Sequence, residues 1–553
     1  MSIQFKNLLL GLALIVLNLK TAVGDANLTQ SLEPESFAVG RSNTLWECPA
    51  PLQSDSNSRS CANLASRTAV SRLNESLYAW ETRQEYCNKR DEWLQKSEAY
   101  KFSAEVVLNE NEQKLDKKIA HLVQDLQRKF LTSNRFCPSR NYLLIKSCVE
   151  NSPLFHILHR MPKGAVLHIH SHSIGSAKWL VERAVKDDNT YIYMADDARL
   201  LKGTMKVFRK GEVPDGFQSM QGLAKRDSQF IEKVVEMITM TPADSAAPNP
   251  WDKFDAIFKR LRLLDYEPIF KEYYRHAFEQ LAEDNVQYVE LRTGLGTLFD
   301  IDGKIYKEED VVAMFRLILK QVKEKYPHFD LKLIISDHRF EDVPQQYKKL
   351  ERAYKLRSEH PDFVCGYDLV GFETTGHPTL YYLDNWLDGA TKFESKYHTS
   401  LPYLFHDGES DWANNKNLFD ALLLGSKRIG HGFNLFNFPW LIQQVIKQDV
   451  CIEVCPISNQ VLGYVHDLRM HPANGYLKAG VPCIISPDDP MMFKTVGVSP
   501  DFWVAIMAWN LDLKDIKQLC MNSIQYSMMS LQEKKATMKK WQAAWDKFVE
   551  DEN

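Results

Sequence analysis

Residues 164–173 read Gly-Ala-Val-Leu-His-Ile-His-Ser-His-Ser, which places His168 and His170 at the end of an apolar run. Side chains two positions apart along a strand point to the same face, so both imidazoles face one side. This run is the first of eight short β-rich runs that are separated by helical stretches. In chain order the runs are Ala165–His170, Val286–Arg292, Leu331–Ser336, Val364–Val370, Pro402–His406, Arg428–His431, Cys451–Cys455 and Pro482–Ile485.

The alternation of these runs with helical stretches is typical of βαβ units and a parallel sheet. Eight units fit a closed barrel, and a doubly wound open sheet is the alternative. Most runs end in His, Asp, Glu or Arg, or are followed by one of these within a few residues. In a barrel such ends meet at one face, whereas in an open sheet they would not converge. We therefore predict an α/β protein built on a (β/α)8 TIM-type barrel.

Three other segments complete the predicted organisation. Residues 1–24 are expected to be a signal peptide, and residues 25–135 a helical N-terminal module. The barrel takes residues 136–553, with an insertion at about 186–249, because this stretch is long for one β/α loop. The helical module is predicted from an apolar stripe with a period near 3.6, formed by Leu115, Ile119, Leu122, Leu126 and Phe130.

The first residues predict the compartment. Lys6 precedes the apolar run Leu8–Leu17, which is shorter than the roughly 20 residues that span a bilayer. A positive residue, a short apolar run and small residues are typical of a cleaved signal peptide, so we expect a secreted, extracellular protein without a stable membrane anchor. Asn27 and Asn74 begin Asn-x-Ser/Thr sequons and are the expected glycosylation sites.

Composition and charge exclude several classes of protein. The 68 basic and 72 acidic residues give a net charge of −4, without the basic patch that a nucleic-acid partner requires. Ten cysteines in 553 residues are too few for a disulfide scaffold. Five of them precede the first barrel strand, an odd number that leaves their pairing open: Cys48, Cys61, Cys87, Cys137 and Cys148.

Polar motifs also follow the fifth, sixth and eighth runs. His406-Asp-Gly-Glu409 brings a third imidazole and a carboxyl group in a glycine-containing turn. His431 stands between two glycines at the end of the sixth run. Asp488 and Asp489 follow the eighth, and two adjacent buried carboxylates repel each other unless a cation or hydrogen-bond donors offset the cost.

Three imidazole nitrogens and one carboxylate oxygen therefore come from the first, fifth and eighth runs. They belong to His168, His170, His406 and Asp488. This donor set suits one Zn²⁺ per chain, with a coordination position left for water. Glu409 and His431 remain at the same rim as acid and base groups.

These motifs resemble the adenosine deaminase branch of the metal-dependent amidohydrolases. The similarity is strongest to the secreted subgroup, the adenosine deaminase-related growth factors, and extends from about residue 70 to the C-terminus. Besides the histidine and aspartate motifs, the phrases that carry it are Met161–Gly164, Trp251–Phe258, Ser336–Arg339, Gly366–Gly371, Arg428–Gly432 and Ile452–Val461.

The resemblance implies hydrolysis of adenosine, and of 2′-deoxyadenosine, to inosine and ammonia at a Zn²⁺ held by the four residues named above. His431 would take the proton of the attacking water. Glu409 would protonate purine N1, and Asp489 would hold N7. Substrate contacts are implied for Gly371, His338, Trp251, Lys253, Phe254, Asp255 and Phe258.

The sequence departs from the family pattern at three places. Ser171 stands where secreted relatives carry an aspartate near the sugar, which bears on the choice of nucleoside. Asp407 replaces the usual alanine, and it either raises the pKa of Glu409 or points to solvent. Residues 186–249 lack the cysteine pair that vertebrate relatives carry in this insertion.

Partners and rival functions follow from the same resemblance. The family's helical module commonly serves dimerisation, so we expect a homodimer through residues 25–135, with a cell-surface receptor or glycan as a further partner. The rival interpretation is a secreted growth-factor-like or receptor-binding protein with weakened catalysis. Another purine nucleoside, such as methylthioadenosine, is a third hypothesis, and AMP is disfavoured because no glycine-rich phosphate cradle is visible.

Overall fold

A computed structural model of the chain describes residues 82–132 and 137–553. The expected signal peptide and both sequons, Asn27 and Asn74, lie outside these residues. Within the described ranges, no helix combines the length and the apolar character that crossing a bilayer requires.

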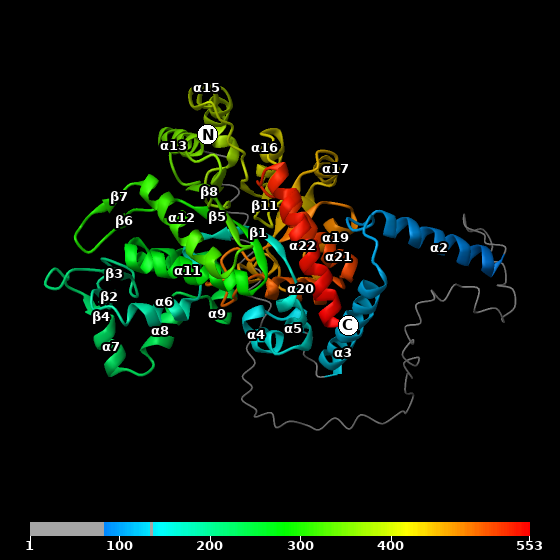
Figure 1. The fold of residues 1–553 in the computed structure, drawn as a ribbon, viewed down its shortest axis with the longest axis horizontal. Helices are drawn as coiled ribbons and strands as arrows, with labels where there is room; N and C mark the ends of the chain where they lie inside the picture. The colour runs from blue at the N-terminus through cyan, green and yellow to red at the C-terminus, as the bar shows by residue number, and fades with distance from the viewer. Residues whose placement is uncertain (1–81, 133–136) are drawn as a thin grey trace, which may run out of the picture. The chain divides into compact units, whose positions relative to one another are not determined.

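Eight parallel strands form a closed barrel (Figure 1). The first four pair in the order β1 (Gly164–His170), β5 (Val286–Thr293), β8 (Asp330–His338) and β9 (Val364–Val370). The other four pair in the order β10 (His406–Asp407), β11 (Arg428–His431), β12 (Cys451–Val454) and β13 (Cys483–Ile485). Parallel bridges from Tyr367 to Tyr403 and from Ile169 to Asp488 join the two sets at both edges. The barrel prediction is confirmed, and the open sheet is wrong.

The predicted runs coincide with the observed strands within one or two residues, except for the fifth. There, regular pairing is confined to β10, while Pro402 and Leu404 reach the neighbouring strand through single hydrogen bonds. Tyr367 N–H donates to the Pro402 carbonyl at 2.9 Å, and Leu404 N–H donates to the Tyr367 carbonyl at 2.8 Å. Because Pro402 has no N–H, this edge of the ladder cannot be complete.

Helices cover the outside of the barrel. In α11 (Glu267–Glu283), Ile269, Tyr273, Ala277 and Leu281 recur every four residues and are all buried, which is the stripe expected of a helix packed on a sheet. The other covering helices are α6 (Ala177–Ala184), α12 (Glu308–Lys325), α13 (Val343–Glu359), α16 (Asn417–Leu423), α17 (Pro439–Lys447), α18 (Pro456–Val461), α19 (Ala473–Lys478), α20 (Ser499–Trp509), α21 (Leu513–Gln525) and α22 (Leu531–Glu552).

The insertion after β1 has secondary structure of its own. Its three short strands, β2 (Thr190–Tyr193), β3 (Met205–Val207) and β4 (Phe217–Ser219), pair antiparallel in the order β3-β2-β4. Three helices follow, and the chain then enters α10, which lies against the mouth of the barrel. The three helices are α7 (Met220–Arg226), α8 (Phe230–Met237) and α9 (Pro242–Ser245), and α10 spans Trp251–Arg260.

The chain divides into two compact units, residues 1–88 and 89–553, and α2 (Arg83–Ala99) crosses the division. Helix α3 (Glu110–Thr132) belongs to the larger unit and packs on α21 and α22. There, Trp545 Nε1 donates to Glu112 Oε1 at 2.8 Å. The helical segment is completed by η2 (Cys137–Ser139), α4 (Tyr142–Glu150) and α5 (Pro153–Arg160).

Candidate metal centre and active site

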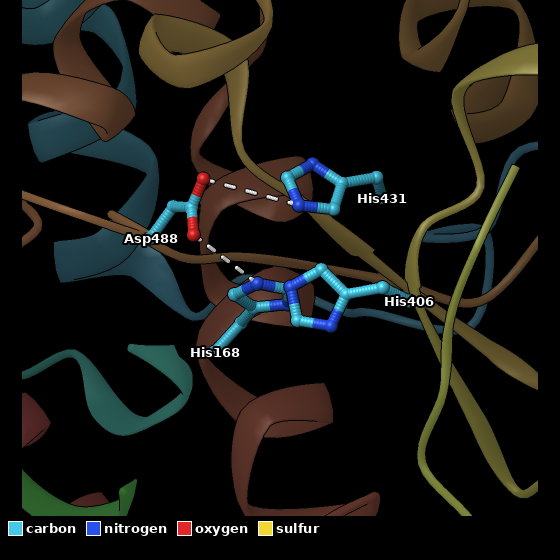
Figure 2. A group of neighbouring side chains, drawn as sticks. All are labelled: His168, His406, His431 and Asp488. Carbon is cyan, nitrogen blue, oxygen red and sulfur yellow. Dashed lines mark ion pairs between the residues drawn. The ribbon is translucent and has the colours of Figure 1, made fainter. Parts of the chain in front are cut away.

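Five polar side chains meet at the carboxyl ends of the barrel strands. His170 Nε2 lies 3.2 Å from both His406 Nε2 and Asp488 Oδ1. His168 Nε2 is 3.3 Å from the same carboxylate oxygen. His431 Nε2 lies 3.9 Å from the other oxygen, Asp488 Oδ2. Figure 2 shows four of the five, His168, His406, His431 and Asp488, turned toward one another.

Buried carboxylates orient two of these imidazoles. His168 Nδ1 lies 2.8 Å from Glu453 Oε2, and His406 Nδ1 lies 2.7 Å from Asp368 Oδ2. Because a carboxylate accepts a hydrogen bond, Nδ1 carries the proton and Nε2 presents its lone pair to the cluster. Arg292 ties the two carboxylates together, since its Nε donates to Asp368 and its Nη2 to Glu453, each at 2.6 Å.

The backbone at the cluster is unusual. His431 has a φ of 60° and Asp488 a φ of 61°, both in the left-handed region that non-glycine residues rarely adopt. Such conformations concentrate at functional sites. At Gly430, an added Cβ would lie 3.0 Å from His168 Cε1 and 3.3 Å from the His406 Cα. Glycine at this position therefore allows the strands to bring the imidazoles together.

The charges are those that a cation needs. Burial would raise the pKa of Asp488, but the neighbouring imidazoles of His168 and His170 hold that pKa well below its ordinary value. Burial lowers the pKa of His406 to about 3 and holds the pKa of His431 well below its ordinary value. Asp488 is therefore anionic, and His406 and His431 are neutral, which are the protonation states of metal ligands.

The donor set fits a metal ion. Within the described residues, His168 Nε2 and His431 Nε2 are buried without a hydrogen-bond partner, and such atoms are rare unless a ligand or ion satisfies them. The ligand atoms of two groups lie within 4.8 Å of one another: His168, His406, His431 and Asp488, and separately His170, Asp488 and Asp489.

The two groups leave open whether His170 or His431 completes the predicted set of ligands. His170 Nε2 stands 3.2 Å from two other donor atoms. His431 Nε2 lies between two carboxylates, 3.7 Å from Glu409 Oε1 and 3.9 Å from Asp488 Oδ2. These contacts favour His170 as a ligand and His431 as a base beside the ion.

Glu409 is suited to donate a proton. Its burial, together with the charges of Asp488 and Glu373, raises its pKa well above the ordinary value, which favours the protonated carboxyl group. Its main chain is held by Glu373, which accepts the N–H of Gly408 at 3.1 Å and that of Glu409 at 2.6 Å. The Glu409 carboxyl group is thus held with its Oε1 3.7 Å from His431 Nε2.

Asp489 and Gly371 are two further residues with predicted roles at the site. Burial and the neighbouring Asp488 raise the pKa of Asp489 well above its ordinary value, and its Oδ1 accepts a hydrogen bond from the Ser173 hydroxyl. A protonated Asp489 can donate to a purine nitrogen. Gly371, with a φ of 110°, directly follows β9 and leaves its backbone without a covering Cβ.

Helix α10 carries most of the predicted substrate contacts. Trp251 stacks on Phe372, with ring centroids 4.6 Å apart and planes 14° apart. Its Nε1 also donates to Tyr464 Oη at 3.0 Å. Phe254 lies parallel to Phe493 at 6.0 Å. Because Phe372 follows β9 and Phe493 follows β13, these rings form an aromatic wall between α10 and the polar cluster.

The remaining predicted contacts lie nearer the mouth of the barrel, with one exception. The Phe258 ring centroid is 6.3 Å from that of His172. Asp255, whose pKa is raised by burial, interacts electrostatically with His338 at the end of β8. Lys253 is the exception, because its Nζ donates to the carbonyl of a residue in α8 at 3.2 Å. Lys253 thus contacts the insertion.

Asp407 and Ser171, which depart from the family pattern, are both buried. Asp407 is fully buried, so the prediction that it points to solvent is wrong. Its Oδ1 accepts from Thr379 Oγ1 at 2.6 Å and lies 3.5 Å from Arg339 Nη2. Ser171 is also buried and hydrogen-bonds to Tyr274. Ser171 and one oxygen of Asp407 thus have local polar partners, whereas Asp407 Oδ2 is buried without a hydrogen-bond partner in the part of the chain that the structure describes.

Sequence reasoning missed the residues that hold the site in place. Ser458 Oγ donates to Asp488 Oδ2 at 2.6 Å, and Asn459 Nδ2 lies 3.2 Å from His431 Nδ1. Like the carboxylates that hold the histidines, they lie far from their partners along the chain. The other residues that hold the site are Arg292, Asp368, Glu373 and Glu453. For the three that lie in strands, a charged residue within an apolar run was the available signal, whereas Glu373 lies after β9 and had no such signal.

Comparisons with known proteins agree with this geometry. Residues 224–544 match the family model described as adenosine deaminase, and residues 65–158 match the adenosine/AMP deaminase N-terminal family. Adenosine deaminase 2 of Sus scrofa is 34% identical over 489 residues, covering 83% of this chain and 93% of the relative. Adenosine deaminase of Aedes albopictus is 33% identical over 482 residues, covering 84% and 88%.

Two solved structures share the fold. An adenine deaminase of Arthrobacter aurescens superposes with a TM-score of 0.51 at 19% identity, over 70% of this chain and 99% of that one. The N6-methyl-AMP deaminase of Arabidopsis thaliana superposes with a TM-score of 0.52 at 18% identity, over 71% and 99%. At these identities the likeness concerns the barrel and not the substrate.

Proposed function

Because this chain belongs to the adenosine deaminase family, we propose that it is an extracellular, Zn²⁺-dependent enzyme that hydrolyses adenosine and 2′-deoxyadenosine. The products are inosine, or its deoxy form, and ammonia. The observation that carries this proposal is the placement of Glu409 and His431, 3.7 Å apart, beside a cluster of metal-binding donors. By lowering extracellular adenosine, the enzyme would modulate growth signalling.

The roles of the side chains follow from their protonation states. His168, His170, His406 and Asp488 would hold one Zn²⁺, whose chemistry is to lower the pKa of water. Neutral His431 takes the proton of the attacking water. Protonated Glu409 gives its proton to purine N1, which makes C6 electrophilic. Protonated Asp489 donates to N7 and orients the ring, while the backbone of Gly371 contacts the purine.

The pocket favours an uncharged nucleoside over a nucleotide. Among the predicted substrate contacts, the acidic side chain of Asp255 offers no counter-charge to a phosphate. Lys253, the one predicted contact with a positive charge, donates to a carbonyl of the insertion. The neighbouring N6-methyl-AMP deaminases share only the fold, so their substrate does not carry over to this chain.

A substrate panel tests the proposal. We expect the secreted protein to deaminate adenosine and 2′-deoxyadenosine, with kcat/KM for AMP and N6-methyl-AMP lower by at least about 100-fold. A chelator is expected to abolish the activity, and added Zn²⁺ to restore it. Loss of adenine absorbance and release of ammonia measure turnover. Turnover that is unaffected by the chelator would refute the metal, and the absence of inosine would refute the function.

The rival function is a secreted growth-factor or receptor-binding protein with weakened catalysis, and it is motivated by Ser171 and Asp407. The polar partners of both side chains favour retained activity instead. Metal-site variants distinguish the two functions. If these variants keep full growth-promoting activity on cells, the rival function is supported. If growth-promoting activity requires deamination, the rival function is refuted. Methylthioadenosine belongs in the same substrate panel.

We also propose that the protein is a homodimer through its N-terminal helical module, with a cell-surface receptor or glycan as a further partner. Large apolar side chains are exposed in this segment, among them Trp93 at 59% and Tyr100 at 72%, and such groups mark association surfaces. Sedimentation of the full chain is expected to give a dimer mass, and Trp93→Lys is expected to weaken the dimer. Trp440→Lys, a change at a tryptophan that is 62% exposed on α17, is the control. A monomeric wild type would contradict the proposal.

A further inference from the structure

Two thiols lie side by side just before the barrel. Cys137 in η2 and Cys148 in α4 have their Sγ atoms 3.5 Å apart, and they are 11 residues apart in the chain. Cys137 is 3% exposed, whereas Cys148 is exposed to solvent. The other free cysteines of the described chain are all buried in the barrel domain: Cys365, Cys451, Cys455, Cys483 and Cys520.

We propose that Cys137 and Cys148 are joined by a disulfide in the protein outside the cell. The pair meets two requirements, because the sulfur atoms are already adjacent and one of them is open to an oxidant. A third observation concerns the compartment. Cys87 is already disulfide-bonded, and a structural disulfide is typical of a chain that folds under oxidising conditions.

The oxidation balances as a thiol–disulfide exchange. The thiolate of Cys148 attacks the S–S bond of an oxidant, either glutathione disulfide or the disulfide of an oxidoreductase, and releases one thiol. Cys137 loses its proton and attacks the mixed disulfide, releasing the second thiol. The two protein thiols give up two electrons and two protons, which the oxidant takes. Cys148 reacts first because it is exposed, whereas burial raises the pKa of Cys137 to about 12.

The bridge would close a segment that is docked on α18. Tyr142 N–H donates to Gln460 Oε1 at 2.8 Å, and Gln460 Nε2 donates back to the Arg140 carbonyl at 3.0 Å. Both residues lie between the two cysteines. A disulfide here reduces the freedom of this segment in the unfolded chain and so stabilises its docking.

Helix α18 also carries two residues that hold the active site. Ser458 hydrogen-bonds to Asp488, and Asn459 to His431. Gln460 follows them directly, so the closed segment covers the helix that orients one proposed metal ligand and the proposed base. The disulfide thus acts as a covalent brace behind the site. This inference rests on the extracellular location given under the proposed function.

Peptide mapping of the full protein, harvested from the medium of secreting cells, tests the bridge. The protein is unfolded in denaturant with iodoacetamide and no reductant, and then digested with trypsin. Cleavage after Arg140 and Lys146 puts the two cysteines on separate peptides. We expect these peptides to be linked and two hydrogen atoms lighter than their sum, while Cys365 and Cys451 are alkylated. Alkylation of both Cys137 and Cys148 would overturn the proposal.

A variant supplies the second readout. Replacing both cysteines, Cys137→Ser with Cys148→Ser, is expected to lower Tm by at least about 3 °C and to leave kcat for adenosine unchanged at 25 °C. Cys365→Ser, at a buried thiol without a neighbouring cysteine, controls for loss of a sulfur atom. An unchanged Tm would contradict the brace. Failure of the proposed function would be seen separately from failure of the disulfide, as absence of the protein from the medium or absence of inosine.

Discussion

Replacing Glu409 by glutamine is expected to lower kcat for adenosine by about 10²–10⁴-fold, the usual contribution of a general acid, while the metal stays bound. The amide has nearly the same shape, but it cannot transfer a proton to purine N1. Because Glu373 holds the backbone of residue 409, the substitution leaves the loop in place. Absorbance assays measure kcat, and elemental analysis measures the metal content.

The pH dependence gives a second test of the same residue. The pKa of Glu409 is raised by burial and by Asp488 and Glu373, so the required protonated form persists above the pH at which an ordinary glutamate ionises and is lost as the pH rises through that raised pKa. Activity of the wild type should fall on the alkaline side, and Glu409→Gln should lack this limb. The exposed Glu232→Gln on α8 is the control. Near-normal turnover by Glu409→Gln would remove Glu409 from its role.

Replacing Arg292 by methionine is expected to lower both stability and metal affinity. Arg292 is fully buried and donates to Asp368 and Glu453, the carboxylates that orient His406 and His168. Removing one partner from a buried ion pair costs about 3–5 kcal/mol, because it leaves an uncompensated charge. Loss of outer partners of metal-binding histidines typically costs about 10–100-fold in metal affinity.

Urea unfolding and a competition titration with a chelator measure these two effects. Arg292→Lys keeps the charge but cannot bridge two carboxylates with a planar group, so we expect an intermediate result. Arg316→Met is the control, because the Arg316–Asp362 pair is open to solvent, with its side chains 37% and 68% exposed, and surface pairs contribute at most about 1 kcal/mol. If the Arg292→Met protein is stable and binds the metal with normal affinity, then Asp368 and Glu453 orient the histidines without Arg292.

The barrel could be predicted because its signal is local. In Val364–Val370, for example, a short apolar run between helical stretches matches β9 residue for residue. The fifth run was the least accurate because Pro402 lacks the N–H that regular pairing with the neighbouring strand needs, so the ladder is confined to β10. In α3, Leu115, Ile119 and Phe130 of the predicted stripe are buried and Leu122 and Leu126 pack against the core. Val123, outside the predicted stripe, is buried as well, because packing on α21 and α22 widens the buried face.

The donor types of the site were also predictable, because histidines two residues apart in a strand must face one side. Their orientation was not. His168 and Glu453 are 285 residues apart in the chain, yet they form a 2.8 Å contact. Likewise, an isolated Asp407 looks like either a titrating neighbour or a surface residue until Arg339 and Thr379 are placed beside it. No local pattern encodes such pairs.

The sequence by itself determined the alternation of strands and helices, the order of the motifs, and the imidazoles and carboxyl groups offered at the strand ends, because these depend on residue type and spacing. Only the tertiary structure decided which ring nitrogens face the cluster, which carboxyl groups are protonated, and how Glu373 fixes Glu409. The physical reason is barrel closure, which brings distant strands into hydrogen-bonding range and removes the water that would otherwise keep each group at its ordinary pKa.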